Sequence, residues 1–390
     1  MSTNFYGMSQ SLTWLGTLGG RESEAYSVSA NGRAVVGRAR NADGYWRAFR
    51  WKERGGMQDL GTLGGKQSEA RGVSTDGRVV VGLAENQSRI HRAFRWTADE
   101  GMVDLGPSGN FPSSATSVSA NGHVVVGWVS EGLLLRHRAF CWTADGGMLD
   151  LGTLGGKQSE ARGVSADGRV VVGWAENQSR SRRAFRWTAD EGMIDLGTLG
   201  GAESEACGVS ADGRVVVGWA QDKTQTQYPF FWTENSGMVR LPALKVFEDS
   251  FWKRLLLFSF VIAEALVLAA LNWRPGNGQA SAVVTTDTGF RIVGWSRDVF
   301  LRKCAFELDS RVLLGMLGPR NINEGVNFPQ VGSRLLEATA VSPEGRCIVG
   351  WGYNAAAKRR EAFRLLESLD FDMESFRQMI HFLNKRRSEN

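Results

Sequence analysis

The phrase SEARGVSADGRVVVGW, residues 159–174, decides the fold of this chain. Two runs with the character of β-strands flank the turn sequence Ala166-Asp167-Gly168, and the second run holds the β-branched residues 170–172. An Asp-Gly pair suits a tight turn because glycine accepts positive φ and aspartate bonds to its own backbone. The phrase therefore predicts two antiparallel strands joined by a short turn.

The same phrase recurs along the chain. Each copy places an alanine 12 residues before the glycine of a Val-rich run. Six phrases of the LGTLGG type, the clearest at 15–20 and 60–65, separate the copies at spacings of 45 or 46 residues. The seven alanines that mark the copies are Ala25, Ala70, Ala115, Ala161, Ala206, Ala282 and Ala338. A fixed period of this length is the signature of a repeat architecture.

Each unit contains two further strand-like runs, RAFRW at 183–187 and GMIDL at 192–196 in the fourth copy. Four short strands in about 45 residues match one blade of a β-propeller. We expect an all-β, seven-bladed β-propeller of four-stranded antiparallel blades over residues 11–366. The blades are expected to start near 25, 70, 115, 161, 206, 282 and 338.

The two ends of the repeat array complement each other. The last unit has no clear fourth strand after Leu365, while the chain opens with an extra one that aligns Leu12–Gly16 with 193–197. We expect residues 11–18 to complete the final blade, because this pairing removes the open sheet edges. Aromatic residues repeat with the units, and we expect them to form the core between blades. One such series is Phe49, Phe94, Phe140, Phe185, Phe230, Phe306 and Phe363.

The repeated phrases, together with Arg-Ala-Phe at 47–49, 92–94, 138–140 and 183–185, resemble those of the HAF repeat family of bacterial repeat proteins. The resemblance implies a propeller-type fold and a secreted or cell-surface location, in a family that includes proteins of intracellular bacteria and therefore suggests an association with virulence. The family's histidine is arginine here, so no role for it carries over. Residues 1–10 lack the basic and apolar regions of a signal peptide, and a cytoplasmic location is the alternative.

Two segments interrupt the repeat pattern. Residues 245–280 form an insertion in the linker to the sixth blade, and they contain the apolar run 254–271. We expect a helix there, packed on the propeller or in contact with a membrane surface. A full span would place Glu264 near the bilayer centre and divide the ring. Residues 370–390 are expected to form a C-terminal helix with a basic tail.

Loops between the second and third strands vary among units and carry many cations. In a propeller they share one face with the loops that join consecutive blades, so we expect a basic rim that binds an anionic partner. The alternative is a solvated rim, and Glu24, Glu69, Glu160 and Glu205 are expected to pair with part of it. The candidate binding residues are Arg89, Arg136, Arg180, Arg182, Lys223, Arg302, Lys303, Lys358, Arg359 and Arg360.

The sequence offers no catalytic or metal motif. Its four histidines occupy unrelated positions, and its four cysteines fall in different units without metal-ligand spacing. We therefore expect a non-catalytic binding scaffold, without cofactor or metal, that contacts a protein or an anionic polymer as a monomer. The net charge of +5 is too modest to indicate specific nucleic-acid binding. The alternatives are a membrane-associated effector using 254–271 and a carbohydrate-active enzyme.

Overall fold

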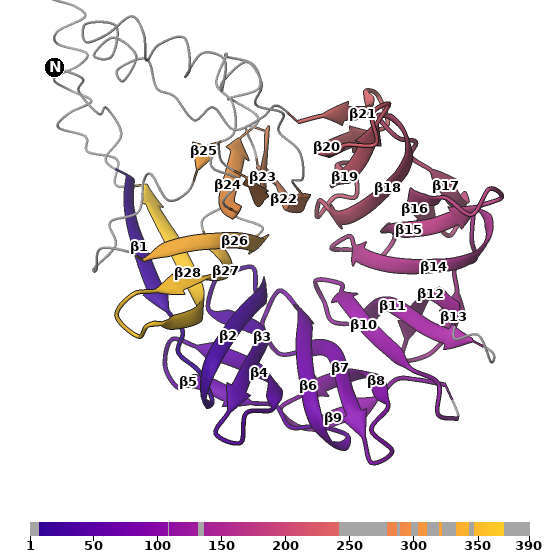
Figure 1. Cartoon of the computed structure of the whole chain (residues 1–390). Coiled ribbons are helices and arrows are strands. Elements are labelled where there is room, and N and C mark those ends of the chain that lie inside the picture. The colour runs from indigo at the N-terminus through magenta and orange to yellow at the C-terminus, as the bar shows by residue number, and fades with distance from the viewer. Residues whose placement is uncertain are drawn as a thin grey trace, which may run out of the picture.

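The computed structural model describes residues 8–107, 109–131, 136–241, 279–286, 289–297, 303–309, 320–321, 333–342 and 347–369. Within these ranges all regular structure is β-strand, arranged as seven four-stranded antiparallel sheets. Six sheets are described with their side chains, and the sheet within 279–321 is described as backbone alone. Figure 1 shows the sheets arranged radially, with the first strand of each toward the centre.

The strands follow the same order in every unit. The first strands are β2 (Gly19–Val28), β6 (Gly64–Val73), β10 (Ser113–Val118), β14 (Gly155–Val164), β18 (Gly200–Val209), β22 (Gln279–Thr286) and β26 (Arg334–Val341). The second strands are β3 (Ala34–Asn41), β7 (Val80–Asn86), β11 (Val124–Glu131), β15 (Val171–Asn177), β19 (Val216–Asp222), β23 (Gly289–Arg297) and β27 (Cys347–Asn354).

The remaining strands lie further from the centre (Figure 1). The third strands are β4 (Trp46–Lys52), β8 (His91–Thr97), β12 (Arg136–Thr143), β16 (Arg182–Thr188), β20 (Gln227–Thr233), β24 (Lys303–Asp309) and β28 (Arg359–Leu369). The fourth strands are β5 (Gly56–Asp59), β9 (Gly101–Asp104), β13 (Gly147–Asp150), β17 (Gly192–Asp195), β21 (Gly237–Arg240), β25 (Arg320–Asn321) and, for the last sheet, β1 (Met8–Trp14).

The N-terminal strand completes the last sheet, as the repeat array predicted. Strand β1 pairs antiparallel with β28, and Leu12 lies opposite Leu365 while Trp14 lies opposite Phe363. The strand pairs extend from Met8 to Leu369, three residues beyond the predicted limits 11 and 366 at either end. Within the predicted closing strand, the Leu15 N–H still donates to the Ala362 carbonyl of β28 at 3.0 Å. Residues 16–18 then lead into the first unit, where Leu18 bridges Asn41.

A serine from each repeated SEA phrase connects neighbouring units. The Ser68 hydroxyl accepts a hydrogen bond from the Ala48 N–H at 2.9 Å and donates one to the Gly61 carbonyl at 2.6 Å. The same pair of bonds recurs between the last unit and the first, because the Ser23 hydroxyl accepts from the Ala362 N–H at 3.0 Å and donates to the Gly16 carbonyl at 2.6 Å. These buried hydroxyls satisfy backbone groups that the sheets leave without a ladder partner. The joint between the last unit and the first is therefore built like the joints within the chain.

The turns between first and second strands form a second set of links. The Ala30 N–H donates to the Thr75 carbonyl, the Thr75 N–H to Ala120, the Ala120 N–H to Ala166, and the Ala166 N–H to Ala211. The four N···O distances lie between 3.0 and 3.2 Å. Each turn thus hydrogen-bonds to the next, which fixes the spacing of the inner strands through five consecutive units.

The cores between sheets consist of the repeated apolar residues. Phe49, Phe94, Phe140, Phe185, Phe230 and Phe363 are fully buried, which confirms the predicted core role for these members of the series; the side chain of Phe306 is not described. Trp51 and Trp96 are 7% and 6% exposed. Burial of such large side chains contributes roughly 1.5–3 kcal/mol each, so the interfaces between sheets supply much of the stability.

The predicted helices at 245–280 and 370–390 lie almost wholly outside the described residues. The predicted insertion 245–280 ends two residues too late. Gln279 and Ala280 already belong to β22, where they pair with Trp295 and Gly294 of β23. In the described part of the chain, we find no helix with the length and apolar character needed to cross a membrane.

Candidate binding face

Two sets of segments lie together on one face, which we call the upper face. It consists of the loops between second and third strands and of the segments that lead into the first strands. Leu18, Leu63, Leu154 and Leu199, which precede first strands, form parallel bridges with Asn41, Asn86, Asn177 and Asp222 at the ends of second strands. In the first, second, fourth and fifth units, the segments before the first strands therefore lie on the same face as the loops between second and third strands, as expected.

Tight turns position the tips of the variable loops. In the second unit, the Arg89 N–H donates to the Asn86 carbonyl at 2.9 Å, and the Asn86 side-chain oxygen accepts from the Ile90 N–H. Arg89 and Arg180 adopt φ of 60° and 61°, where the first unit uses Gly44. Lys358 also has positive φ, at 51°. A side chain costs roughly 1–2 kcal/mol in this left-handed region, so these cations occupy positions that glycine would fill without strain.

The structure separates the predicted binding residues into groups. Arg89, Arg180, Lys223 and Lys358 are exposed, and their side chains form no ion pair or hydrogen bond with the described residues. We call these four residues the free cations. Arg136 is half-buried at the start of β12, Arg302 lies outside the described residues, and Lys303 is described as backbone alone.

Three further candidates are held in ion pairs. Arg359 donates to the Glu361 carboxylate at 2.6 Å, and Arg360 pairs with Glu24 of the first unit. Arg182 pairs with Glu205 of the following unit at 2.9 Å. These three arginines are therefore already paired. Arg360 and Arg182 pair with two of the repeated glutamates that were expected to neutralise part of the rim, whereas the partner of Arg359 is Glu361 of its own strand.

Arg182 and Arg360 belong to a recurring arrangement at the start of the third strand. Arg182 lies 4.1 Å from the centre of the Trp174 ring, and Arg360 lies 3.7 Å from that of Trp351. His137 occupies the equivalent position in the third unit, where it stacks on Trp128 at 3.9 Å. Its Nδ1 lies 2.6 Å from a Glu160 oxygen of the fourth unit. In each case an aromatic ring supports a group that reaches the carboxylate of the next unit.

Arginines on the inner strands extend these contacts between units. Arg162 contacts Glu160 at 3.0 Å within its own unit and Glu205 of the next at 2.8 Å. Arg38 likewise contacts Glu24 and Glu69, each at 2.9 Å. The carboxylates are nearly buried, so an absent partner would leave a desolvated charge. We infer that this network stabilises the contacts between sheets.

Glu160 gives the network a testable pH dependence. Burial alone would raise the pKa of Glu160, but the hydrogen bond with His137 and the charge of Arg162 outweigh it and lower the pKa. A lowered folded-state pKa stabilises the fold above the unfolded value of about 4.3, and this contribution is lost as pH falls through the folded pKa. We expect Glu160→Gln to lower the free energy of unfolding at pH 7, and we expect this penalty to shrink as the pH falls below about 4.3 toward the folded-state pKa. Urea titrations at pH 7 and at a series of pH values below about 4.3 measure the penalty, and a penalty that does not change with pH would contradict the assignment.

The arginines of the Arg-Ala-Phe triplets have a structural role. Arg47, Arg92, Arg138 and Arg183 pair with Asp59, Asp104, Asp150 and Asp195 at 2.7–3.1 Å. Each pair connects the third strand to the end of the fourth strand in the same unit. The triplet thus holds the outer strand in place.

The described residues can be compared with the needs of a metal site and of a reactive thiol. They contain no group of three or more His, Cys, Asp or Glu side chains that could hold a metal. Burial raises the pKa of the Cys347 thiol to about 12, although Arg364 opposes the shift, and burial also raises the pKa of Cys141. Thiols of this kind stay protonated near neutral pH and are poor nucleophiles.

These features define a β-propeller of four-stranded antiparallel blades. No known family profile and no curated protein matches the chain. Among solved structures, the β-propeller domain of the Trilobed protease from Pyrococcus furiosus, described as having an open velcro topology, is similar with a TM-score of 0.53 and 8% identity. The match covers 90% of this chain and 97% of that domain. At this identity the likeness supports the fold alone.

Two TolB structures are also similar. The putative TolB from Agrobacterium tumefaciens has a TM-score of 0.48 and 13% identity, with 89% of this chain and 98% of that one covered. TolB from Acinetobacter baumannii has a TM-score of 0.44 and 11% identity, with 76% of this chain covered. The chain spans 62% of the length of that second TolB.

Proposed function

We propose that this chain is a non-catalytic propeller scaffold whose upper face binds an anionic partner, either an acidic protein surface or an anionic polymer. The free cations Arg89, Arg180, Lys223 and Lys358 carry the proposal, because they are exposed at loop tips without carboxylate partners among the described residues. The glutamates nearby are engaged elsewhere. For example, Glu85 accepts hydrogen bonds from the Lys66 and Gln67 N–H groups at 2.9 and 3.2 Å.

The distribution of charge supports a role in binding. Three of the free cations occupy left-handed positions, where the side chain adds strain that the fold does not require. Cations presented at separate loop tips attract an extended anionic surface and raise its rate of association. Binding by such a rim would weaken steeply as the salt concentration rises.

The proposal includes a ring of seven blades. The sheet containing β22 provides the link between its neighbours, because β22 contacts β18 and β19 while β23 and β24 contact β26. It also includes membership of the HAF repeat family and a secreted or cell-surface location. The repeated phrases of the sequence support both.

Charge reversal on the upper face tests the proposed function. We expect Arg89→Glu/Arg180→Glu/Lys358→Glu to raise the Kd for heparin or for poly-glutamate about tenfold or more at low salt, since three attractive charges become repulsive. Surface plasmon resonance of the full chain measures this change.

A matched control makes the same charge change on the opposite face. Arg78, Arg169 and Arg214 lie in the exposed turns between first and second strands, so Arg78→Glu/Arg169→Glu/Arg214→Glu alters the net charge equally. We expect this variant to retain most of the affinity. Equal losses in both variants would mean that net charge acts alone, and unchanged binding in the first variant would exclude the upper face.

A further inference from the structure

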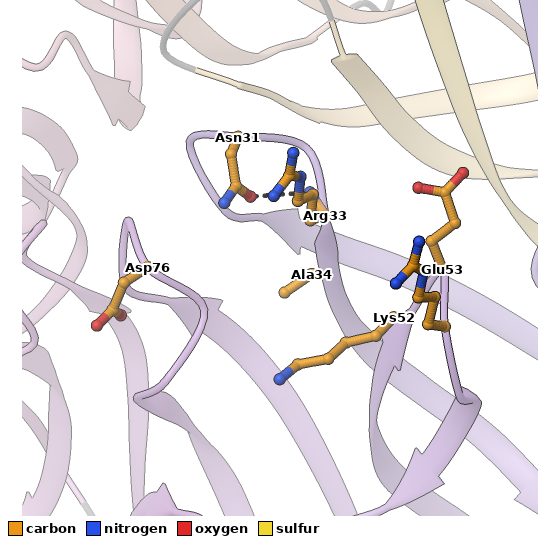
Figure 2. Close-up of a pocket in the computed structure, with 7 residues that line it drawn as sticks. Asn31, Arg33, Ala34, Lys52, Glu53 and Asp76 are labelled. Atoms are coloured by element: carbon orange, nitrogen blue, oxygen red, sulfur yellow. Dashed lines mark hydrogen bonds between the residues drawn. The ribbon is translucent and has the colours of Figure 1, made fainter.

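A pocket lies on the face opposite to the upper face, at the first unit. It has a volume of about 510 Å³ and lies between the turns Asn31–Arg33 and Lys52–Arg54, with Asp76 of the second unit at its edge. Figure 2 shows Lys52 extending into the space between the turn that bears Asn31 and the turn that bears Asp76. Ligand pockets commonly have volumes of about 300–1,000 Å³.

The turn 52–54 departs from the repeat. In the second and fourth units the equivalent residues are Thr-Ala-Asp-Glu, where the threonine hydroxyl accepts the N–H of Glu100 or Glu191 at 3.2 Å. The glutamates in turn pair with Arg95 and Arg186 at 2.8 Å. The first unit replaces this self-contained, acidic turn with Lys52-Glu53-Arg54, which changes its formal charge from −2 to +1.

The neighbouring turn of the first unit also carries less negative charge than the equivalent turns of the second and fourth units. The second and fourth units have Asp76 and Asp167 close to Arg78 and Arg169, at 3.7 and 3.8 Å. The first unit has Asn31 instead, so Arg33 lacks the carboxylate. The Asn31 side-chain oxygen accepts from the Ser29 hydroxyl and from the Arg33 N–H, which leaves its amide hydrogens for another acceptor.

A buried arginine contacts one residue of the pocket lining. The side chain of Arg364 on β28 is 4% exposed, and its Nε and Nη1 groups have no hydrogen-bond partner among the described residues. Its Nη2 is 3.6 Å from Glu53, a lining residue whose side chain is 69% exposed. Its guanidinium lies 5.0 Å from the centre of the Trp51 ring, and its positive charge adds to that of Arg33, Lys52 and Arg54 near Glu53.

We infer that this pocket is a binding site for a small hydrophilic anion that also carries hydroxyl groups, of the sugar phosphate or sugar acid class. Arg33, Lys52, Arg54 and the Asn31 amide provide donors for a phosphate or carboxylate. Glu53 and Asp76 provide acceptors for hydroxyl groups at the rim. The site differs in face, residues and ligand size from the proposed binding of a large partner.

Isothermal titration calorimetry on the full chain tests the inference with glucose 6-phosphate, glucuronate and glucose. We expect at least one of the two anions to bind, and neutral glucose to bind at least tenfold more weakly. The anion that binds identifies a phosphate ester or a carboxylate as the recognised group. The inference is overturned if neither anion binds at 10 mM, or if glucose binds as tightly as they do.

The variant Lys52→Thr/Glu53→Ala/Arg54→Asp is expected to weaken anion binding at least tenfold. It gives the first unit the sequence Trp-Thr-Ala-Asp-Gly-Gly, which the third unit already has at 142–147. This sequence is therefore compatible with the turn. The matched control is Thr188→Lys/Ala189→Glu/Asp190→Arg in the fourth unit, where Asp167 still pairs with Arg169. The control should bind like the unaltered chain. Equal affinity in the first variant would place the ligand elsewhere.

Discussion

Deletion of residues 1–14 is expected to lower the melting temperature by roughly 5 °C and to make the protein associate. The deletion removes β1, which pairs along its whole length with β28. Leu12 and Trp14 pack against a cluster that includes the fully buried Phe363 and Leu365, and Trp14 meets Phe363 edge to face at 6.4 Å. Loss of two large apolar side chains removes roughly 3–6 kcal/mol, a large share of the stability of a typical protein.

The deletion also exposes an edge. Without β1, the third strand of the last sheet presents unpaired N–H and C=O groups, which are a template for pairing with another chain. Circular dichroism measures the change in melting temperature, and size-exclusion chromatography with light scattering measures the association. Deletion of residues 1–7 alone is the control, because it leaves β1 intact. If the two deletions behaved alike, β1 would not be needed to complete the last sheet.

The fold could be predicted from the sequence because the repeat encodes it redundantly. The serines of the SEA phrases accept the same backbone hydrogen bond between units, and the described phenylalanines of the series fill the same buried position. The closing strand was predictable for a different reason, since an unmatched strand at one end and a missing strand at the other leave one economical pairing. The helices expected in the two segments outside the repeat have no such redundancy, and they fall outside the described residues.

The start of the first strands was not predicted. Paired glycines usually indicate a loop, yet Gly19 and Gly20 begin β2. A Cβ atom on Gly20 would lie 2.5 Å from the Arg40 Cβ, and one on Gly65 would lie 2.4 Å from the Glu85 Cβ. These glycines therefore allow close approach between two strands. That requirement depends on the partner strand, which local sequence does not reveal.

The candidate site was predicted in part. Loop variability identified the free cations Arg89, Arg180, Lys223 and Lys358. It could not identify Arg182 and Arg360 as residues paired with the next unit, because that contact depends on the geometry between sheets. The pocket on the opposite face was missed, although a signal existed: the turn 52–54 breaks a pattern that other units keep. In a repeat protein, departures from the repeat indicate functional positions better than its constant residues do.

Replacement of Glu205 by alanine is expected to lower the free energy of unfolding by about 2–3 kcal/mol. The Glu205 side chain is 8% exposed and contacts Arg162 at 2.8 Å and Arg182 at 2.9 Å. Breaking a buried ion pair costs about 3–5 kcal/mol, because the remaining charge stays desolvated. The two arginine side chains are 31% and 38% exposed, so water partly solvates them and the expected loss is smaller.

Urea titration at pH 7 measures this loss, and Arg169→Ala is the control. Arg169 is also in an ion pair, with Asp167 at 3.8 Å, but its side chain is 86% exposed, so we expect a change within about 0.5 kcal/mol. The double variant Arg182→Ala/Glu205→Ala should lose less than the sum of its single variants, because the second substitution removes a charge that the first left unpaired. Additive losses would show that Arg182 and Glu205 act independently of each other, so that any link through Glu205 would depend on Arg162.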